Sequence, residues 1–470
     1  MGAMDFPRAR FRPPFPAPHA APLSSIRMLA ALTRNPLTVW NKAHYRLPIL
    51  IGDSVIGRTA VINDPDAVRR VLLDNAENYR KDKLTRRMLG NSSSGTGLLL
   101  AEDDLWKRQR RAMAGLFSPR SIDAFAPAME AAARALAARW GRQREGRTID
   151  VNAEMALFTL DVLERTIFSD GLAESPGRFA AEMTRFFEIF GRPDPADLLG
   201  LGKWAPRLTR IGGEKPLRFF DEAVTRILGR RRAAPPEDAP HDLLSLLLAA
   251  RDPATGEGLA EDDIRANIIT FIAAGHETTA NALTWTLYLL SKDPETLARV
   301  EAEAEADALG DQPLNAASTA GLVWTRAALE ESMRLYPPAP TFSREAIGPD
   351  VLGGFAIRPD TRILIAPWLL HRHHTLWERP EEFDPRRFLP EQRASIPRFA
   401  YLPFGGGARV CIGLGFAMQE ALIALAVLLR SFRLEHAPGH NVEPVQRMTL
   451  RPKGGMPMIL RKRGESALAA

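Results

Sequence analysis

The chain has 470 residues and is 45% hydrophobic, which is enough for a large buried core. Its 62 Lys and Arg against 56 Asp and Glu give a net charge of +6 without a basic block, so we expect no nucleic-acid-binding arm. A single cysteine excludes an intramolecular disulfide framework, and we see no apolar run of the roughly 18–20 residues that span a membrane. We therefore expect a cytoplasmic protein.

The first hundred residues predict an extended segment, short strands and a loop. Residues 1–24 are rich in Pro and Arg, lack the apolar stretch of a signal peptide, and should run extended along the surface. Residues 48–66 alternate apolar runs with Gly and Asp, which is typical of short strands. Asp64 and Pro65 then open a helix, and the sequence GNSSSGTG at 90–97 predicts a loop.

Residues 102–335 are helical in pattern almost throughout. Ser121 is expected to cap a helix over 121–140. The segment 261–293 is apolar nearly all round through its centre, so this long helix should cross the core. The acidic stretch 301–311 predicts a helical face exposed to solvent.

The last part of the chain mixes strands, an irregular segment and one strong helix. Residues 350–366 have a strand and turn pattern, whereas 378–399 contain too many prolines for regular structure and should be functional or held by specific packing. A helix over 415–432 is followed by PKGGMPMIL at 452–460, which predicts a last hairpin. With no repeat and no clear linker, the sequence predicts a single mainly α domain with minor β sheets over 25–470.

The only cysteine, Cys411, lies in FGGGARVCIG at 404–413, directly before the helix 415–432. A free cysteine is ordinarily a small buried hydrophobe. Here the surrounding glycines allow a tight backbone, and the helix N-terminus together with Arg409 favours a thiolate. Such a thiolate could be a nucleophile with a His partner, or a metal ligand. Zinc would need further ligands nearby, and HRHH at 371–374 is far away in sequence, whereas one thiolate suits haem iron.

The same ten residues resemble the haem-binding signature of cytochromes P450, F-x-x-G-x-R-x-C-x-G. Every fixed position matches: Phe404, Gly407, Arg409, Cys411 and Gly413. The resemblance extends over about residues 45–460 and implies a single P450-type domain, in which a long distal helix crosses the core and the cysteine loop precedes the proximal helix. It also implies haem b (Fe-protoporphyrin IX), with Cys411 as the axial ligand of iron and Gly405 in contact with the haem. O2 is then the co-substrate.

Two further motifs resemble structural elements of this family. ESMR at 331–334 matches E-x-x-R, although such a pair alone is usually a surface ion pair. FDPRRF at 383–388 matches the P-x-R-F element. The resemblance implies a buried triad of Glu331, Arg334 and Arg387 that holds the irregular segment and takes no part in catalysis.

The resemblance also implies partners for the two haem carboxylates, which need cations once they are buried. WKRQR at 106–110 resembles the W-x-x-x-R element through Trp106 and Arg110, a pair that by itself would more often be a stacked surface pair. Arg344 lies where many relatives carry another residue that binds a haem carboxylate, and Arg409 is the third expected cation.

AGHETT at 274–279 places polar residues in the centre of the long apolar helix. This can be a packing glycine with hydroxyls satisfied by the backbone, but local rule-breaking of this kind tends to mark function. The motif resembles the family's A/G-G-x-[D/E]-T. It implies that Gly275 opens a groove over the haem for O2 and water, that Ala274 contacts the haem, and that Glu277 and Thr278 deliver protons. His276 is expected to be a packing or hydrogen-bonding residue.

We expect an apolar substrate pocket. Its predicted walls are the helix around Ile268, Ile272 and Ala274, residues Ala339, Thr341 and Phe342, and parts of 82–100, 172–205 and 454–458. The wording of the motifs is similar to fatty-acid-hydroxylating members, and a terpenoid-like substrate also fits an apolar pocket.

The leading hypothesis is a haem-thiolate monooxygenase that hydroxylates or epoxidises an apolar small molecule with O2 and two electrons. The sequence leaves no room for a fused flavin or iron–sulfur domain, so electrons should come from a ferredoxin or flavodoxin with its reductase, docked on the basic proximal face. The alternative is peroxygenase or rearrangement chemistry without external electrons, and a sensor or carrier is a third. The presence of both Glu277 and Thr278 favours the monooxygenase.

Overall fold

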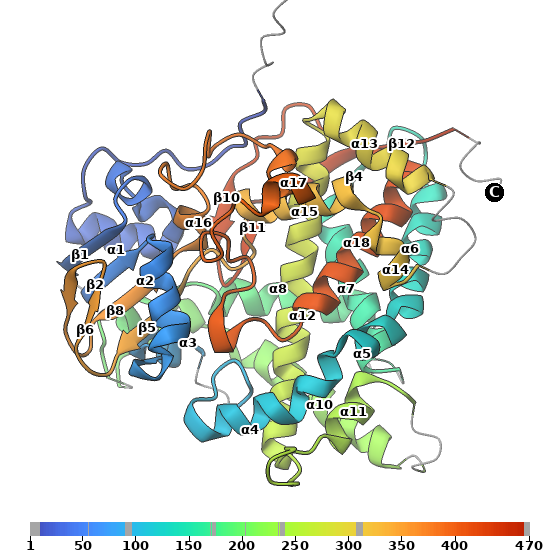
Figure 1. The fold of residues 1–470 in the computed structure, drawn as a ribbon. Coiled ribbons are helices and arrows are strands. Elements are labelled where there is room, and N and C mark those ends of the chain that lie inside the picture. The colour runs from blue at the N-terminus through green and yellow to red at the C-terminus, as the bar shows by residue number, and fades with distance from the viewer. Residues whose placement is uncertain are drawn as a thin grey trace, which may run out of the picture.

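The computed structural model describes residues 10–54, 56–89, 96–169, 171, 175–202, 204–233, 235, 240–306 and 314–464. Helices form most of the molecule (Figure 1). The helices of the described chain are α1 (Ser25–Arg34), α2 (Pro65–Arg69), α3 (Lys83–Leu89), α4 (Asp103–Ala114), α5 (Pro119–Ala124), α6 (Ala126–Gly141), α7 (Val151–Ile167), α8 (Pro176–Phe190), α9 (Pro195–Leu198), α10 (Glu214–Ala233), α11 (Leu243–Ala249), α12 (Glu261–Leu290), α13 (Pro294–Glu305), α14 (Ala316–Ala320), α15 (Val323–Leu335), α16 (Pro367–Leu370), α17 (Pro390–Arg393) and α18 (Leu414–Ser431).

The strands form small sheets on two sides of the helices. They are β1 (Ile49–Ser54), β2 (Gly57–Ile62), β3 (Tyr79–Arg80), β4 (Thr148–Asp150), β5 (Phe342–Ala346), β6 (Asp350–Leu352), β7 (Phe355–Ile357), β8 (Arg362–Ile365), β9 (Phe432–His436), β10 (Pro444–Gln446), β11 (Leu450–Pro452) and β12 (Pro457–Lys462). The largest sheet has the order β1-β2-β8-β5-β3, and the others are β4-β12-β9, β10-β11 and β6-β7. The predicted last hairpin is wrong, because β12 pairs with β9 and β4, whereas β11 pairs with β10.

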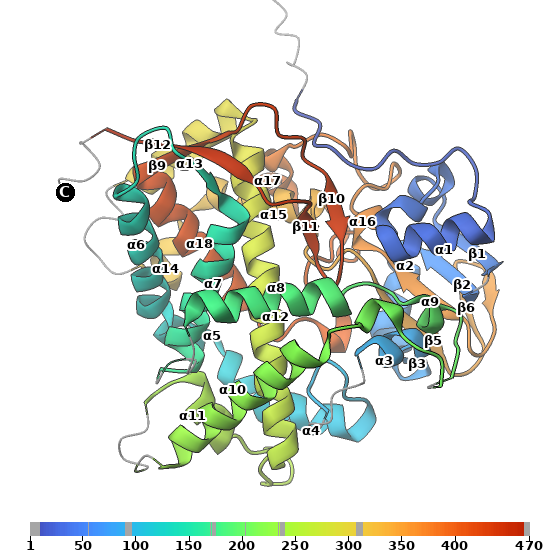
Figure 2. The ribbon, with the colours of Figure 1, turned by 180° about the vertical axis from the view of Figure 1, so that it is seen from behind.

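Helix α12 crosses the core, as its apolar pattern predicts. It runs through the middle of the molecule in both views (Figures 1 and 2) and packs against α7, α15 and α18. Three acidic residues in its first turn, Glu261, Asp262 and Asp263, complement the positive end of the helix dipole. Most of its side chains are buried, so packing on every side holds the helix in place.

Helix α18 lies beside α12 and begins three residues after Cys411. Contrary to the sequence expectation, it is long and apolar enough to cross a membrane by length and composition. However, 67% of its 18 residues are buried inside the fold, where they pack against α6 and α13. The apolar side chains of α18 therefore form part of the protein core.

Two expectations about the helices need correction. Ser121 does not cap a helix over 121–140, because Ser118 caps α5 and a second helix, α6, starts after Phe125. The acidic face is not wholly solvated either, since Glu301 is buried and pairs with Arg433. Residues 307–311 of that stretch lie outside the described residues, as do 90–95 of the predicted loop.

Candidate active site

The loop before α18 holds Cys411 in a tight backbone that only glycine permits. Gly405 and Gly407 have φ angles of 71° and 67°, which favour residues without a side chain. A Cβ atom on Gly407 would lie 1.8 Å from the carbonyl oxygen of Leu72. The amide of Cys411 donates to the carbonyl of Phe404 at 2.9 Å, which closes the loop. These constraints fix the direction of the thiol.

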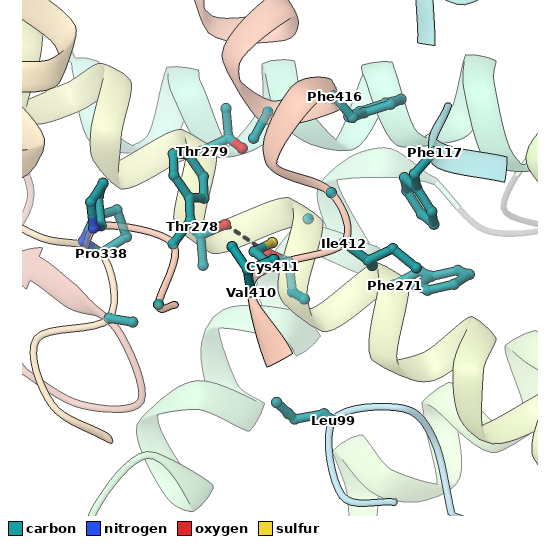
Figure 3. A pocket seen from close by; sticks show the side chains of 18 of the residues that line it. Leu99, Phe117, Phe271, Thr278, Thr279, Pro338, Val410, Cys411, Ile412 and Phe416 are labelled. Atoms are coloured by element: carbon teal, nitrogen blue, oxygen red, sulfur yellow. Dashed lines mark hydrogen bonds between the residues drawn. The ribbon is translucent and has the colours of Figure 1, made fainter. Parts of the chain in front are cut away.

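The thiol lines a cavity of about 430 Å³ between this loop and α12. Figure 3 shows Val410, Cys411 and Ile412 on the loop wall, and Phe271 and Thr278 on the α12 wall. The accessible surface of Cys411 faces this cavity. Most of the remaining wall is apolar and comes from several separate parts of the chain: Leu98, Leu99, Phe117, Leu163, Ile167, Leu243, Ala274, Leu329, Met333, Pro338, Ala339, Phe342, Phe404 and Phe416.

One edge of the cavity carries an excess of positive charge. Lys81, Arg110, Arg344 and Arg409 all line it. The one carboxylate that pairs with them in the described chain is Glu102, 3.2 Å from Arg409 and 3.3 Å from Lys81. Burial, with a smaller contribution from Arg409, lowers the pKa of Lys81 to about 8 and that of Arg344 to about 10. A buried cluster of this kind is stabilised by an anionic ligand.

Helix α12 presents a glycine and a hydroxyl to the cavity. Gly275 and Thr278 both line it, and the Oγ1 of Thr278 donates to the carbonyl of Ala274 at 2.6 Å. Glu277 lies one residue away and leaves the cavity wall, because its carboxylate turns to Arg451 of β11 at 3.5 Å. Burial raises the pKa of Glu277 to about 7, although Arg451 opposes the shift.

Behind the cysteine loop, α15 carries a fully buried ion pair. The guanidinium of Arg334 donates to both carboxylate oxygens of Glu331, at 2.6 and 2.8 Å. It also donates to the carbonyls of Pro380 and Glu382 in the irregular segment, and to the carbonyl of His371 at the end of α16. Arg387 lies 3.6 Å from Glu331. The structure thus brings the three predicted residues together, and they hold this segment against α15.

The comparison with known families agrees with this geometry over most of the chain. The family model for cytochrome P450 matches residues 48–458. The chain belongs to the cytochrome P450 family. It is therefore an oxidoreductase, a haem-thiolate monooxygenase with the P450 fold, and the family implies haem, O2, a substrate and a redox partner.

Individual P450 relatives match most of this chain. The chain is 34% identical over 394 residues to cyclooctatin synthase of Streptomyces melanosporofaciens, covering 82% of this chain and 83% of that protein. It is also 34% identical to the bifunctional cytochrome P450/NADPH–P450 reductase 2 of Bacillus subtilis, covering 74% of this chain and 33% of that protein. The crystal structure of the cytochrome P450DA haem domain superposes with a TM-score of 0.81 at 26% identity, covering 97% of this chain and 100% of that one.

The residues of the cavity fit a haem. The thiol, the apolar walls and the unbalanced cations match an iron ligand, a flat apolar ring and two carboxylates. Trp106, Gly405, Gly413 and Ala274, which the resemblance assigns to haem binding, also line the cavity.

The expected electrostatics of the thiol need correction. Burial raises the pKa of Cys411, and the opposing effects come from the amide of Gly413 and from Arg110. Arg409, the predicted positive neighbour, stacks over Trp106 at 4.4 Å and bonds with Ala101 and Glu102 instead. Burial therefore works against a thiolate here, and a bound metal cation would favour it.

Several predicted pocket residues lie elsewhere. Ile268 and Ile272 are buried in the core and do not line the cavity. Thr341 accepts a hydrogen bond from Gln446 and does not line the cavity. Among described residues, neither 172–205 nor 454–458 contributes to its wall.

His276 behaves as the sequence reading expected. It is buried off the cavity wall, and burial lowers the pKa of its imidazole to about 4. Its backbone carbonyl accepts a hydrogen bond from Thr159 of α7 at 2.9 Å. We therefore assign His276 to the packing of α7 against α12.

Two cavity residues escaped the sequence analysis. Lys81 carries no local signal, because only the fold brings it beside Arg344. Glu420 is a buried carboxyl in the otherwise apolar α18, and burial raises its pKa well above the usual range despite a hydrogen bond from Thr279. An acidic residue in an apolar helix was a readable signal for a special position.

Proposed function

We propose that this P450 hydroxylates or epoxidises an apolar small molecule, with Cys411 as the axial ligand of a haem b iron. The observation that carries the proposal is one cavity in which Cys411 lines the loop wall and Gly275 and Thr278 line the α12 wall. The same cavity has a cationic edge. Haem bound there activates O2 for insertion into a C–H or C=C bond of the substrate.

The chain's own residues bind and orient the cofactor. Cys411 would supply the sulfur ligand, and the loop glycines leave space for a flat ring beside it. Arg110 and Arg344 have no carboxylate partner in the described chain, so they would take the carboxylates of the haem together with Lys81 and Arg409. Binding an anion there removes the electrostatic cost of leaving these cations unpaired.

The residues of α12 hold and move protons. The hydroxyl of Thr278 donates to Ala274 here and can redirect its proton to an oxygen atom in the cavity. Glu277, with a pKa of about 7, exists in both charge states near neutral pH, which suits a group that passes protons inward. A Cβ atom at position 275 would lie 3.0 Å from the side chain of Leu163. Glycine therefore leaves this space open, whereas a larger residue would fill it.

The apolar wall favours a hydrocarbon-rich substrate. Aliphatic and aromatic side chains from α4, α7, α11, α12, α15 and β5 surround the space beside Thr278, with few polar groups to orient a polar molecule. Because one relative is cyclooctatin synthase, we propose a terpenoid-like compound first and a fatty acid second.

We propose that the electrons arrive from a separate ferredoxin or flavodoxin with its reductase, and that the enzyme works in the cytoplasm, where a lone thiol stays reduced. The net charge of +6 supports attraction of an acidic carrier. The presence of both Glu277 and Thr278 argues against peroxygenase or rearrangement chemistry, because those reactions do not need proton delivery to O2.

The test compares two ways of driving the purified haem-loaded chain with a candidate terpenoid. Product should form with NADPH, ferredoxin and ferredoxin reductase, and should be much lower with hydrogen peroxide alone. Thr278→Ala should lower the product formed per O2 consumed, while Thr278→Ser should restore most of it. Faster turnover with peroxide, unaffected by Thr278→Ala, would support the alternative.

A further inference from the structure

The run HRHH at 371–374 lies outside the haem cavity, yet two of its three histidines are buried. His371 and His373 are 0% and 1% exposed, whereas His374 lies at the surface. Among the described residues, no group of three His, Cys, Asp or Glu side chains is placed to hold a metal ion. Buried polar groups are normally hydrogen-bonded, so the partners of these rings indicate their roles.

Both ring nitrogens of His371 have backbone partners, in two segments that are far apart in sequence. Its Nε2 lies 2.8 Å from the amide nitrogen of Leu402, just before the cysteine loop. Its Nδ1 lies 3.2 Å from the carbonyl oxygen of Arg334 on α15. The carbonyl of His371 also accepts from the guanidinium of Arg334 at 2.7 Å. His371 is therefore attached to α15 by two bonds and holds Leu402 by a third.

The direction of these bonds fixes the tautomer of the ring. The amide of Leu402 can only donate, so Nε2 accepts, and Nδ1 carries the proton that is donated to the Arg334 carbonyl. Burial, followed by the positive charges of Arg334 and Arg372, lowers the pKa of His371 to about 3 and keeps the ring neutral. Both nitrogens are thus engaged, and neither is left for a metal ion or a substrate.

A short series of backbone hydrogen bonds leads from Leu402 to Cys411. The carbonyl of Leu402 accepts from the amide of Gly405 at 3.2 Å, and the carbonyl of Phe404 accepts from the amide of Cys411 at 2.9 Å. Between them lies Pro403, which has no amide hydrogen. The amide of Leu402 is therefore the last backbone donor before the cysteine loop, and it is the group that His371 binds.

Tyr401 attaches the same segment to α15 in a different way. Its hydroxyl donates to the carbonyl of Glu330 at 2.8 Å, and its ring centre lies 5.1 Å from that of His371. The bond of Tyr401 is made by a side chain that can turn about its own torsions, whereas the bond of His371 is made to the backbone itself. His371 therefore constrains the path of the chain into the cysteine loop more directly.

We propose that His371 is a positioning residue for the haem ligand, because its Nε2 fixes the backbone before the cysteine loop to α15. The proposal rests on Cys411 as the axial ligand of the haem. A residue that only fills space would need the volume of the ring but no acceptor atom. Without the acceptor, the buried amide of Leu402 is left unsatisfied, and the backbone shifts toward another partner. The direction of the thiol is then less well fixed, so the haem loses its thiolate ligand more readily.

The length of the side chain at position 371 tests this role. In His371→Gln the amide oxygen can take the place of Nε2 and accept from Leu402, whereas in His371→Asn the shorter amide reaches only the place of Nδ1. The haem-loaded, reduced and CO-bound variants are followed in urea below the unfolding transition. The readout is the ratio of the red-shifted Soret band to the band of haem without its thiolate. His371→Asn should lower this ratio about tenfold, the effect of one unsatisfied buried donor, and His371→Gln should restore most of it.

His373→Asn is the matched control. This ring is also buried and hydrogen-bonded, but its partners are the carbonyl of Leu47 and the hydroxyl of Thr375, which lie outside the cysteine loop. His373→Asn should therefore lower the urea midpoint of unfolding, measured by far-UV circular dichroism, without changing the ratio of the two bands below that transition.

A measurement on the unchanged chain tests the same role without a substitution. In urea, hydrogen exchange of the peptide 399–404, which carries the amide of Leu402, should begin at the concentration at which the red-shifted band is lost. Exchange that begins well before the band is lost would overturn the proposal, because the ligand would then not depend on this bond.

Two further results would also overturn it. The first is an equal ratio of the two bands in His371→Asn and His371→Gln, which would show that the acceptor atom is not what matters. The second is an equal fall of the ratio in His373→Asn. A haem-loaded unchanged chain that never shows the red-shifted band would instead overturn the assignment of Cys411, so the two failures are distinguishable.

Discussion

Arg451 lies 3.5 Å from Glu277, and the same guanidinium contacts Glu188 of α8. This ion pair ties Glu277 of α12, the residue proposed to carry protons, to the β10–β11 hairpin and to a helix that is remote in sequence. The side chain of Glu188 is 42% exposed. Glu188, Arg451 and Glu277 therefore form a row of charged side chains that runs from the solvent to α12. The charge state of Glu277 should therefore depend on Arg451.

Arg451→Met should shift the alkaline limb of the pH–rate profile upward. Burial raises the pKa of Glu277 to about 7 and Arg451 opposes the shift, so removing this cation lets the pKa rise further and keeps the acid protonated at higher pH. Product formation per O2 consumed, measured across pH, reports the shift. Arg447→Met, which removes a cation beside Glu188 only, is the control. A downward shift would contradict the assignment.

Glu331→Ala should destabilise the fold by about 3–5 kcal/mol, because it leaves the fully buried Arg334 without its carboxylate. Urea unfolding measures this free energy. Arg393→Ala breaks an ion pair whose arginine is 46% exposed, so it should cost about 1 kcal/mol or less. Equal effects of the two substitutions would show that Glu331 and Arg334 do not hold the irregular segment.

Arg110→Ala and Arg344→Ala should each weaken haem retention by about tenfold, the effect of losing one charge-assisted hydrogen bond. The rate of haem transfer to an acceptor protein measures the loss. Lys107→Ala changes an exposed cation on the same helix as Arg110 and should leave that rate unchanged. Haem transfer at the unchanged rate in both arginine variants would rule out their contact with the haem carboxylates.

Glu420→Gln should make the holoenzyme more stable at neutral pH and less sensitive to pH. Burial raises the folded-state pKa of Glu420 well above its unfolded value. Its stabilising contribution is therefore complete below an unfolded pKa of about 4.3 and is lost as pH rises toward the folded pKa. Gln keeps a polar partner for Thr279 without this ionisation. Denaturant unfolding at several pH values would show a flatter profile, and an unchanged slope would contradict the account.

The sequence predicted the features that short motifs encode. In FGGGARVCIG, ESMR and AGHETT the important residues lie only a few positions apart. The cysteine loop, the Glu331–Arg334 pair and the unusual centre of α12 could therefore be predicted without knowledge of the fold. The long buried helix followed from its apolar pattern in the same way.

The rest depends on which segments meet in space. Ile268 and Ile272 were expected in the pocket because they are apolar and lie on α12, but the fold buries both in the core while Phe271 and Gly275 line the cavity. Arg409 turned to Glu102, a partner about three hundred residues away that no local rule identifies. Lys81 and Arg451 also reach the site through contacts between distant segments.

The central claim is that the Cys411 thiolate is the axial ligand of a haem bound in this cavity. The direct measurement is the absorption spectrum of the reduced, CO-bound chain, compared with that of Cys411→Ala folded to the same helical content. The unchanged chain should show the strongly red-shifted Soret band of a thiolate-ligated haem, and Cys411→Ala should lose it. A red-shifted band that persists in Cys411→Ala, or that never appears in the haem-loaded unchanged chain, would contradict it.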